Sequence, residues 1–231
     1  MFNLYKLTQN YHKAIPFLDN CIRIAADNQE WVIQFMKIKA EILNGLYSIT
    51  ADKIYLNKAI EEYESIVQKQ PNNIQILNNL AYLLADSNSA LDKALDYAER
   101  AYKALPNNPS VLDTYGYVLL KNRKVKEADE FLQRAMQLYE QNKINAPLEV
   151  YEHIGGVKEK LGQVDEALRA YKQALKFAGK DVSQEIKNRL SQAIERLSFQ
   201  DFLMVFSKLF HRFFVISFSP LRKGREGFVD I

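Results

Sequence analysis

The strongest constraint on the fold is a small residue that recurs at a fixed distance along the chain. Ala94 and Ala128 are 34 residues apart, and so are Ala101 and Ala135. Self-similarity with a period of about 20 to 50 residues marks repeat architectures. The sequence therefore predicts a stack of similar units rather than one irregular core.

Two further units continue the pattern with small changes in length. Ala128 and Ala167 are 39 residues apart, which indicates a five-residue insertion that we place at Glu140–Pro147. Upstream, Ala59 precedes Ala94 by 35 residues. The period is therefore close to constant over most of the chain.

Each unit carries two helical patterns that meet at small residues. Gly116 and Gly155 lie in first helices, and we expect them to face Ala128 and Ala167 in second helices. Small residues let two helix backbones approach, while large apolar residues fill the space around the crossing. One such pair cannot bury its own apolar face, so the units must stack. With 8 Gly and 6 Pro in 231 residues, long helices are favoured over a turn-rich fold.

In these features the sequence resembles the tetratricopeptide repeat (TPR) family, over roughly residues 1–180. Pro71 and Pro106 match the family's proline after the second helix, although Trp never occupies the first large position here. The resemblance implies an all-α fold, a right-handed superhelical solenoid of antiparallel helix pairs with about four to five repeats. Residues 77–85 and 112–120 resemble repeats of bacterial TPR proteins, some of which are linked to envelope assembly and exopolysaccharide secretion.

The N-terminal end of the predicted solenoid is irregular. Ala14, Leu18 and Cys21 match the second helix of a unit, and the 13 residues before Ala14 leave room for a shortened first helix. The next unit has its helices near Trp31–Tyr47 and Lys53–Lys69. Our hypothesis is that the chain starts inside a repeat of a longer parent protein. An incomplete first unit exposes apolar surface, which is compatible with a homo-oligomer.

At the other end, Ser183–Leu197 reads as a capping helix that closes a solenoid spanning residues 1–198. Leu190 and Ile194 lie on its apolar side, and Lys187 and Gln192 lie on its polar side. Solenoids need such a final helix with a polar outer face. Residues 199–231 then form a separate tail that is rich in aromatic and basic residues.

The tail contains an apolar segment, Phe202–Phe218, which holds six of the 13 Phe residues. Lys208, His211 and Arg212 in its middle argue against a membrane span. Three readings stay open: the segment packs on the last repeat, lies on an anionic membrane surface, or is an extension without a selected function. The helical stripe and the basic residues on which these readings depend are Phe202, Phe206, Leu209, Phe213, Ile216, Arg222, Lys223 and Arg225.

The sequence lacks the motifs of catalysis and of metal binding. His12, His153 and His211 lie in different units without a metal-ligand spacing, and no phosphate-binding loop or nucleophile elbow occurs. We therefore predict that the chain is not an enzyme and that it has no cofactor or metal site. Cys21 is interpreted as a small packing residue.

Charge and cysteine content narrow the partners and the compartment. The 31 Lys and Arg against 28 Asp and Glu are mixed along the chain, so no nucleic-acid partner is predicted. One cysteine excludes an internal disulfide, and residues 1–15 lack the apolar run of a signal peptide. These features favour the cytoplasm, and the tail leaves a peripheral membrane location open.

The resemblance also implies where a partner binds, because first helices of TPR units line a concave groove. The groove residues are Gln75, Asn78, Asn79, Tyr82, Asp113, Thr114, Tyr117, Lys121, Glu149, Glu152, His153 and Glu159, together with Gln34, Lys37 and Glu41 in the long unit. Asn can pair with an extended peptide, and Tyr is a frequent interface anchor. The acidic end predicts a partner segment with basic or neutral polar character.

The predicted function is a scaffold or adaptor that holds a protein or peptide in this groove. The alternative is a membrane-surface assembly factor of a bacterial envelope or polysaccharide-secretion complex, attached through a helix at residues 202–214.

Overall fold

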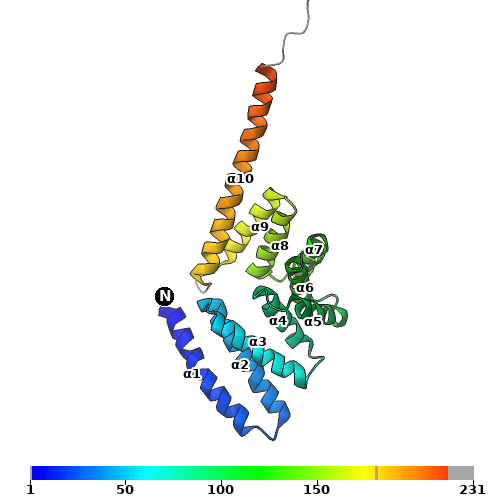
Figure 1. The fold of residues 1–231 in the computed structure, drawn as a ribbon. Helices are drawn as coiled ribbons and strands as arrows, with labels where there is room; N and C mark the ends of the chain where they lie inside the picture. The colour runs from blue at the N-terminus through cyan, green and yellow to red at the C-terminus, as the bar shows by residue number, and fades with distance from the viewer. Residues whose placement is uncertain (1, 180–181, 218–231) are drawn as a thin grey trace, which may run out of the picture.

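The structure is a computed structural model that describes the backbone of residues 2–179 and 182–217 and the side chains of residues 10–179 and 182–207. The described residues form helices and no strand (Figure 1). The helices are α1 (Phe2–Ile24), α2 (Gln29–Thr50), α3 (Lys53–Lys69), α4 (Ile74–Asp86), α5 (Leu91–Ala104), α6 (Pro109–Lys121), α7 (Val125–Gln141), α8 (Leu148–Lys160), α9 (Val164–Phe177) and α10 (Gln184–Ser217).

The helices pair into stacked hairpins. Four complete hairpins, α2–α3, α4–α5, α6–α7 and α8–α9, lie between the flanking helices α1 and α10. We call the first helix of a hairpin helix A and the second helix B. Each helix A also packs against the helix B before it, so α1 takes the place of a helix B and α10 that of a helix A. The predicted all-α solenoid with about four to five repeats is confirmed.

Polar caps fix where the helices begin. The side chain of Asn73 accepts a hydrogen bond from the backbone N–H of Ile76, and Asn108 accepts one from that of Val111. Pro109 is the first residue of α6, where a missing N–H costs nothing. These caps satisfy N–H groups that have no partner inside the helix. The Asn residues between repeats thus set the hairpin boundaries.

Two helix crossings require the absence of a side chain. A Cβ added to Gly116 would lie 2.7 Å from Cγ of Leu132 and 3.3 Å from the carbonyl oxygen of Ala128. A Cβ added to Gly155 would lie 2.7 Å from Cε1 of Tyr171. Gly155 therefore faces the ring of Tyr171 more closely than it faces Ala167, which was the expected neighbour, because Tyr171 is a larger side chain one turn further along α9.

The N-terminal end differs from the sequence-based expectation. A shortened helix A was expected before Ala14, but α1 is one continuous helix from Phe2 to Ile24. Pro16 lies inside this helix without ending it. The residues before Ala14 extend the helix B instead of forming a helix A, since they contain neither Gly nor Pro to interrupt the helix.

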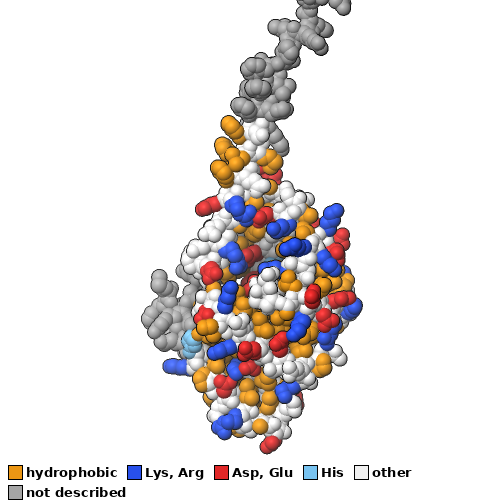
Figure 2. Space-filling view, viewed as in Figure 1, with side chains coloured by type: hydrophobic (Ala, Val, Ile, Leu, Met, Phe, Trp, Pro, Cys, Tyr) orange, Lys and Arg blue, Asp and Glu red, His pale blue; other side chains and the backbone are white. Residues whose placement is uncertain are grey.

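The capping helix is longer than expected. Leu190 and Leu197 of α10 are buried against α9, as a cap requires. We expected this helix to end at Leu197, but α10 continues to Ser217, because the sequence from Gln184 to Ser217 contains neither Gly nor Pro. Its second half extends beyond the stacked hairpins, and hydrophobic side chains gather on it (Figures 1 and 2).

Several expectations for the tail lie outside the described residues. They concern the side chains of Leu209, Phe213, Ile216, Lys208, His211 and Arg212, and residues 218–231 with Arg222, Lys223 and Arg225. Within the described part of the chain, no helix is both long enough and apolar enough to cross a membrane.

Candidate partner-binding face

Consecutive helices A are tied together by a repeated polar contact. Asp113, the fifth residue of α6, lies 2.9 Å (Oδ1) from Nδ1 of His153, the sixth residue of α8. Glu152, the fifth residue of α8, accepts two hydrogen bonds of 2.8 and 3.0 Å from Arg189, the sixth residue of α10. The same register thus recurs from one helix A to the next. It also shows that the first half of α10 occupies the place of a helix A.

Aromatic rings fill the centre of the same face, which we call the inner face. The ring of Tyr117 stacks on that of His153 at 4.0 Å between centroids, and Tyr82 lies 5.5 Å from Tyr117 and 6.0 Å from His153. The hydroxyl of Tyr117 donates to Asp86 over 3.0 Å, and that of Tyr47 in α2 donates to the other oxygen of Asp86 over 2.8 Å. These contacts join α2, α4, α6 and α8.

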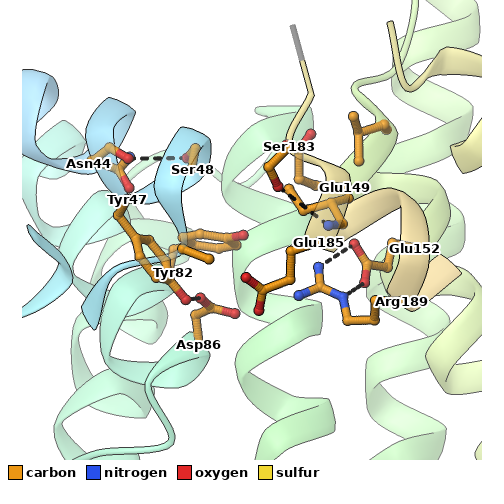
Figure 3. A pocket seen from close by; sticks show the side chains of 13 residues that line it. Asn44, Tyr47, Ser48, Tyr82, Asp86, Glu149, Glu152, Ser183, Glu185 and Arg189 are labelled. Carbon is orange, nitrogen blue, oxygen red and sulfur yellow. Dashed lines mark hydrogen bonds and ion pairs between the residues drawn. The ribbon is translucent and has the colours of Figure 1, made fainter. Parts of the chain in front are cut away.

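A small cavity lies on the inner face where the solenoid brings its two ends together (Figure 3). Tyr47, Tyr82 and Asp86 line it from α2 and α4, and Glu149 and Glu152 line it from α8. Further wall residues come from the same stretch of α2 as Tyr47, from the residue before α10 and from the start of α10; they are Asn44, Ser48, Ser183, Glu185 and Arg189. Its volume of about 70 Å³ admits a few water molecules or the end of one side chain.

The charges of the cavity are predominantly negative. Asp86, Glu149, Glu152 and Glu185 face one cation, Arg189, which is already bound to Glu152. Burial raises the pKa of Glu149 above its usual value, because the carboxylate loses solvation without gaining an ion-pair partner there. The site is therefore able to accept a positively charged group.

The acidic end of the predicted groove is covered by the chain itself. Seven residues beyond Arg189, Arg196 donates two hydrogen bonds to Glu159, at 2.6 and 3.1 Å. The Arg196 guanidinium lowers the pKa of Glu159. Two of the three predicted acidic groove residues, Glu152 and Glu159, thus bind arginines of α10, and Glu149 lines the cavity without an ion-pair partner among the described residues.

The structure brings five of the predicted binding residues into one cluster, namely Tyr82, Asp113, Tyr117, Glu152 and His153. Lys121 lies over the ring of Tyr117 at 5.1 Å. Gln75 instead accepts a hydrogen bond from Lys37 of α2, and Asn79 donates one to the buried hydroxyl of Tyr63. Much of the set therefore holds the repeats together.

Several predicted residues are buried rather than available, and besides Asp113, Tyr117 and His153 these include two that lie outside the cluster. Thr114 is buried, and so is Asn78, whose Oδ1 accepts no hydrogen bond from the described part of the protein. Asn78 is the fifth residue of α4 and Thr114 the sixth of α6. They therefore occupy the positions at which Asp113 and His153 make the polar contact one repeat later.

Sequence reasoning missed most of the residues that line the cavity, among them Tyr47, Asp86, Glu185 and Arg189. Asp86 could have been predicted from the sequence, because it is the last residue of α4 and lies at a groove-facing position of the repeat pattern. Glu185 and Arg189 were missed because α10 was interpreted as a cap with no role on the inner face. The described residues contain no group of His, Cys, Asp or Glu that could hold a metal ion.

Comparison with known proteins supports the repeat class. A family model described as "Anaphase-promoting complex, cyclosome, subunit 3" matches residues 87–174. The type IV pilus biogenesis factor PilW is similar at a TM-score of 0.57 and 18% identity, over 85% of this chain and 86% of that one. A thermophilic TPR protein of Thermus thermophilus is similar at 0.50 and 18%, over 80% and 98%.

A third similar structure is that of the APC/C hetero-tetramer Cut9–Hcn1, with a TM-score of 0.54 and 16% identity, over 87% of this chain and 40% of that one. A search of curated proteins gave no match. At these identities the structural likeness concerns the fold. It defines the class as an α-solenoid of helical hairpins.

Within that class, the hairpin geometry, the small residues at the crossings and the family match agree. The chain has a fold of the tetratricopeptide-repeat type.

Proposed function

We propose that the chain is a protein-interaction scaffold without catalytic activity, whose inner face holds a segment of a partner protein through a basic side chain. The observation that carries this proposal is the charge of the cavity, in which four carboxylates face one arginine that is already paired. Opposite charges attract more strongly in a partly buried site than in water. The rings of Tyr47 and Tyr82 in the wall add favourable contacts for a cation.

The size of the cavity limits what enters it. About 70 Å³ excludes a peptide main chain but accepts the end of a Lys or Arg side chain. The partner's backbone would then run across the mouth, where Asn44 and Ser48 offer polar groups. This arrangement keeps the predicted basic character of the partner segment. Of the predicted acidic residues Glu149, Glu152 and Glu159 it retains Glu149 as an anchor, and it adds Glu185.

Affinity capture with matched variants tests the proposal. The full chain is used as bait beside Glu149→Gln with Glu185→Gln, which removes two charges and preserves shape. The control is Glu127→Gln with Glu130→Gln, which removes two exposed charges on α7. We expect a partner that the full chain and the control retain and the cavity variant loses. Equal retention by all three baits would remove the support for the cavity.

Attachment to a membrane surface is a second candidate function. One observation favours it: Phe199, Phe202, Leu203 and Val205 are exposed on the second half of α10. Apolar side chains on a helix can insert at the lipid interface. Flotation of the full chain with anionic vesicles, beside a chain that ends at Ser198, tests this candidate. If neither chain floats, the candidate fails.

A further inference from the structure

One side of α1 is exposed to solvent, namely the side on which every other helix B packs against the helix A of its own hairpin. In the complete hairpins, the alanine at the crossing of helix A and helix B is fully buried, as at Ala94, Ala128 and Ala167. Ala14 occupies the matching place in α1 and stays partly exposed. Among the described residues, no helix A pairs with α1. Among the helices that the structure describes, none fills the helix-A place beside α1, which we call the vacant place.

Apolar side chains mark this vacant place. Phe17 and Ile24 of α1 are 67% and 72% exposed, and Trp31 and Ile38 of α2 are 56% and 43% exposed. Both pairs are spaced by seven residues, which puts their members on one side of each helix. A helix A touches the next helix A in the pairs α4–α6 and α6–α8, so a helix in the vacant place would touch α2 as well as α1. Exposed apolar surface of this kind indicates an interaction site.

The second half of α10 carries the complementary feature. The first half of α10 already occupies the place of a helix A, as the contact of Arg189 with Glu152 shows. The helix then continues with Phe199 and Phe202 exposed by 63% and 61%, and with Leu203 and Val205 each exposed by 48%. Helix α10 thus begins in the place of a helix A, and the apolar side chains on its second half are not covered by the hairpins of the same chain (Figure 2).

The second half of α10 does not reach α1 of its own chain. The helix is continuous from Gln184 and leads upward away from the hairpins, whereas α1 runs downward on the other side of the start of α10 (Figure 1). Residues 198–217 make a helix of about 30 Å, close to the roughly 34 Å of α1. A second copy of the chain can therefore supply a helix of the right type and length.

We propose that two copies of the chain exchange their ends. The second half of α10 from one copy fills the vacant helix-A place on α1 and α2 of the other, and a two-fold axis repeats the contact. Each copy thereby completes the first repeat of its partner. The dimer buries Phe17 and Ile24 against Phe199 and Phe202.

Sedimentation of the full chain and of two double variants tests this dimer. The face variant is Phe17→Glu with Ile24→Glu, and the arm variant is Phe199→Glu with Phe202→Glu. We expect the unmodified chain to sediment as a dimer and each variant to raise the dimer dissociation constant at least tenfold. Ile144→Glu, at an exposed apolar residue between α7 and α8, is the matched control and keeps the dimer. Circular dichroism verifies that each variant retains its helices.

Mixing the two variants gives the sharpest result. The face variant keeps an unmodified second half of α10, and the arm variant keeps an unmodified α1. These two parts fit each other, so the mixture should recover dimers that neither variant forms alone. A dimer made arm to arm or face to face would show no recovery and would overturn the proposal. The proposal also fails if the unmodified chain is a monomer at every concentration, including the case in which the arm binds anionic vesicles as a monomer.

Discussion

His153 of α8 lies against Asp113 of α6, with 2.9 Å between Nδ1 and Oδ1, and is sealed from solvent. Burial alone would lower the pKa of His153, but the carboxylate of Asp113, followed by those of Glu152 and Glu149, raises it overall. The folded protein therefore holds the proton more tightly than the unfolded chain does. The contact joins two repeats, so its protonation bears on the stability of the stack.

We expect this contact to weaken as the pH rises. A group whose pKa is raised on folding stabilises the protein fully below its unfolded value, about 6.5 for His, and loses that contribution as the pH passes its folded value. Replacement of His153 by Gln removes the effect. Urea unfolding at about pH 6 and about pH 9 should show a larger loss of stability for His153→Gln at the lower pH. A loss that is equal at both pH values would contradict this assignment.

Gly155 and Gly156 are adjacent in α8 but have opposite tolerance for a methyl group. A Cβ at Gly155 would lie 2.7 Å from the ring of Tyr171, whereas one at Gly156 would lie 3.4 Å from Cδ2 of Leu120. Ala favours a helix over Gly by about 1 kcal/mol. Overpacking a core costs about 1 to 3 kcal/mol. We expect Gly155→Ala to lower the free energy of unfolding and Gly156→Ala to leave it unchanged or raise it slightly.

Thermal and urea unfolding of the two glycine variants provide the measurement, and each variant is the other's control. Both add the same group to the same helix, so propensity cancels between them. If Gly155→Ala is as stable as Gly156→Ala, the close approach of α8 and α9 at this crossing is wrong.

Arg189 and Arg196 fasten the first half of α10 to α8. Both arginine side chains are more than half exposed, so each pair contributes about 0.5 to 1 kcal/mol. We expect Arg189→Ala with Arg196→Ala to lower the free energy of unfolding by about 1 to 2 kcal/mol. Because Arg196 lowers the pKa of Glu159, its share is present above about pH 4.3 and fades as the pH falls through the lower folded value.

Salt separates this electrostatic effect from lost packing. The difference between the double variant and the unmodified chain should shrink in about 1 M NaCl, where charges beyond about 3 Å are screened. Lys126→Ala with Lys172→Ala removes two exposed cations on α7 and α9 and is expected to change stability little. If salt leaves the loss of stability unchanged, the arginines stabilise α10 through packing of their aliphatic carbons and not through their charges.

The repeat architecture was predictable because its determinants are local. Close packing of two helices is indicated by small residues such as Ala94, Gly116 and Ala128. The start of a helix is indicated by an Asn such as Asn73 or Asn108. Both signals lie in short stretches of sequence. The ends were less predictable. Pro16 is as compatible with a turn as with the helix that α1 forms, and the sequence after Leu197 carries no signal that ends α10.

The candidate site was predictable in part, for a physical reason. Position within the repeat identifies a side chain such as Tyr82 or His153 as inward-facing. It does not reveal that the solenoid brings α2 and α10 together, which depends on the accumulated rotation of all repeats. The pairing of Glu152 with Arg189, and the cavity beside it, follow from that long-range closure.

Lys158 gives the last prediction, because it is a buried cation that bridges two hairpins. Its side chain is 8% exposed, and its Nζ lies 3.0 Å from Asp129 of α7 and 3.3 Å from Glu166 of α9. Removing one partner of a buried ion pair costs about 3 to 5 kcal/mol, and less where the carboxylates are partly exposed, as they are here. We expect Lys158→Met to lose about 1 to 3 kcal/mol of unfolding free energy.

The control is Lys93→Met, because Lys93 is 62% exposed and lies 3.6 Å from the carboxylate of Glu64. This variant should lose at most about 0.5 kcal/mol. Equal losses in urea unfolding would show that Lys158 packs between α7 and α9 without binding their carboxylates together.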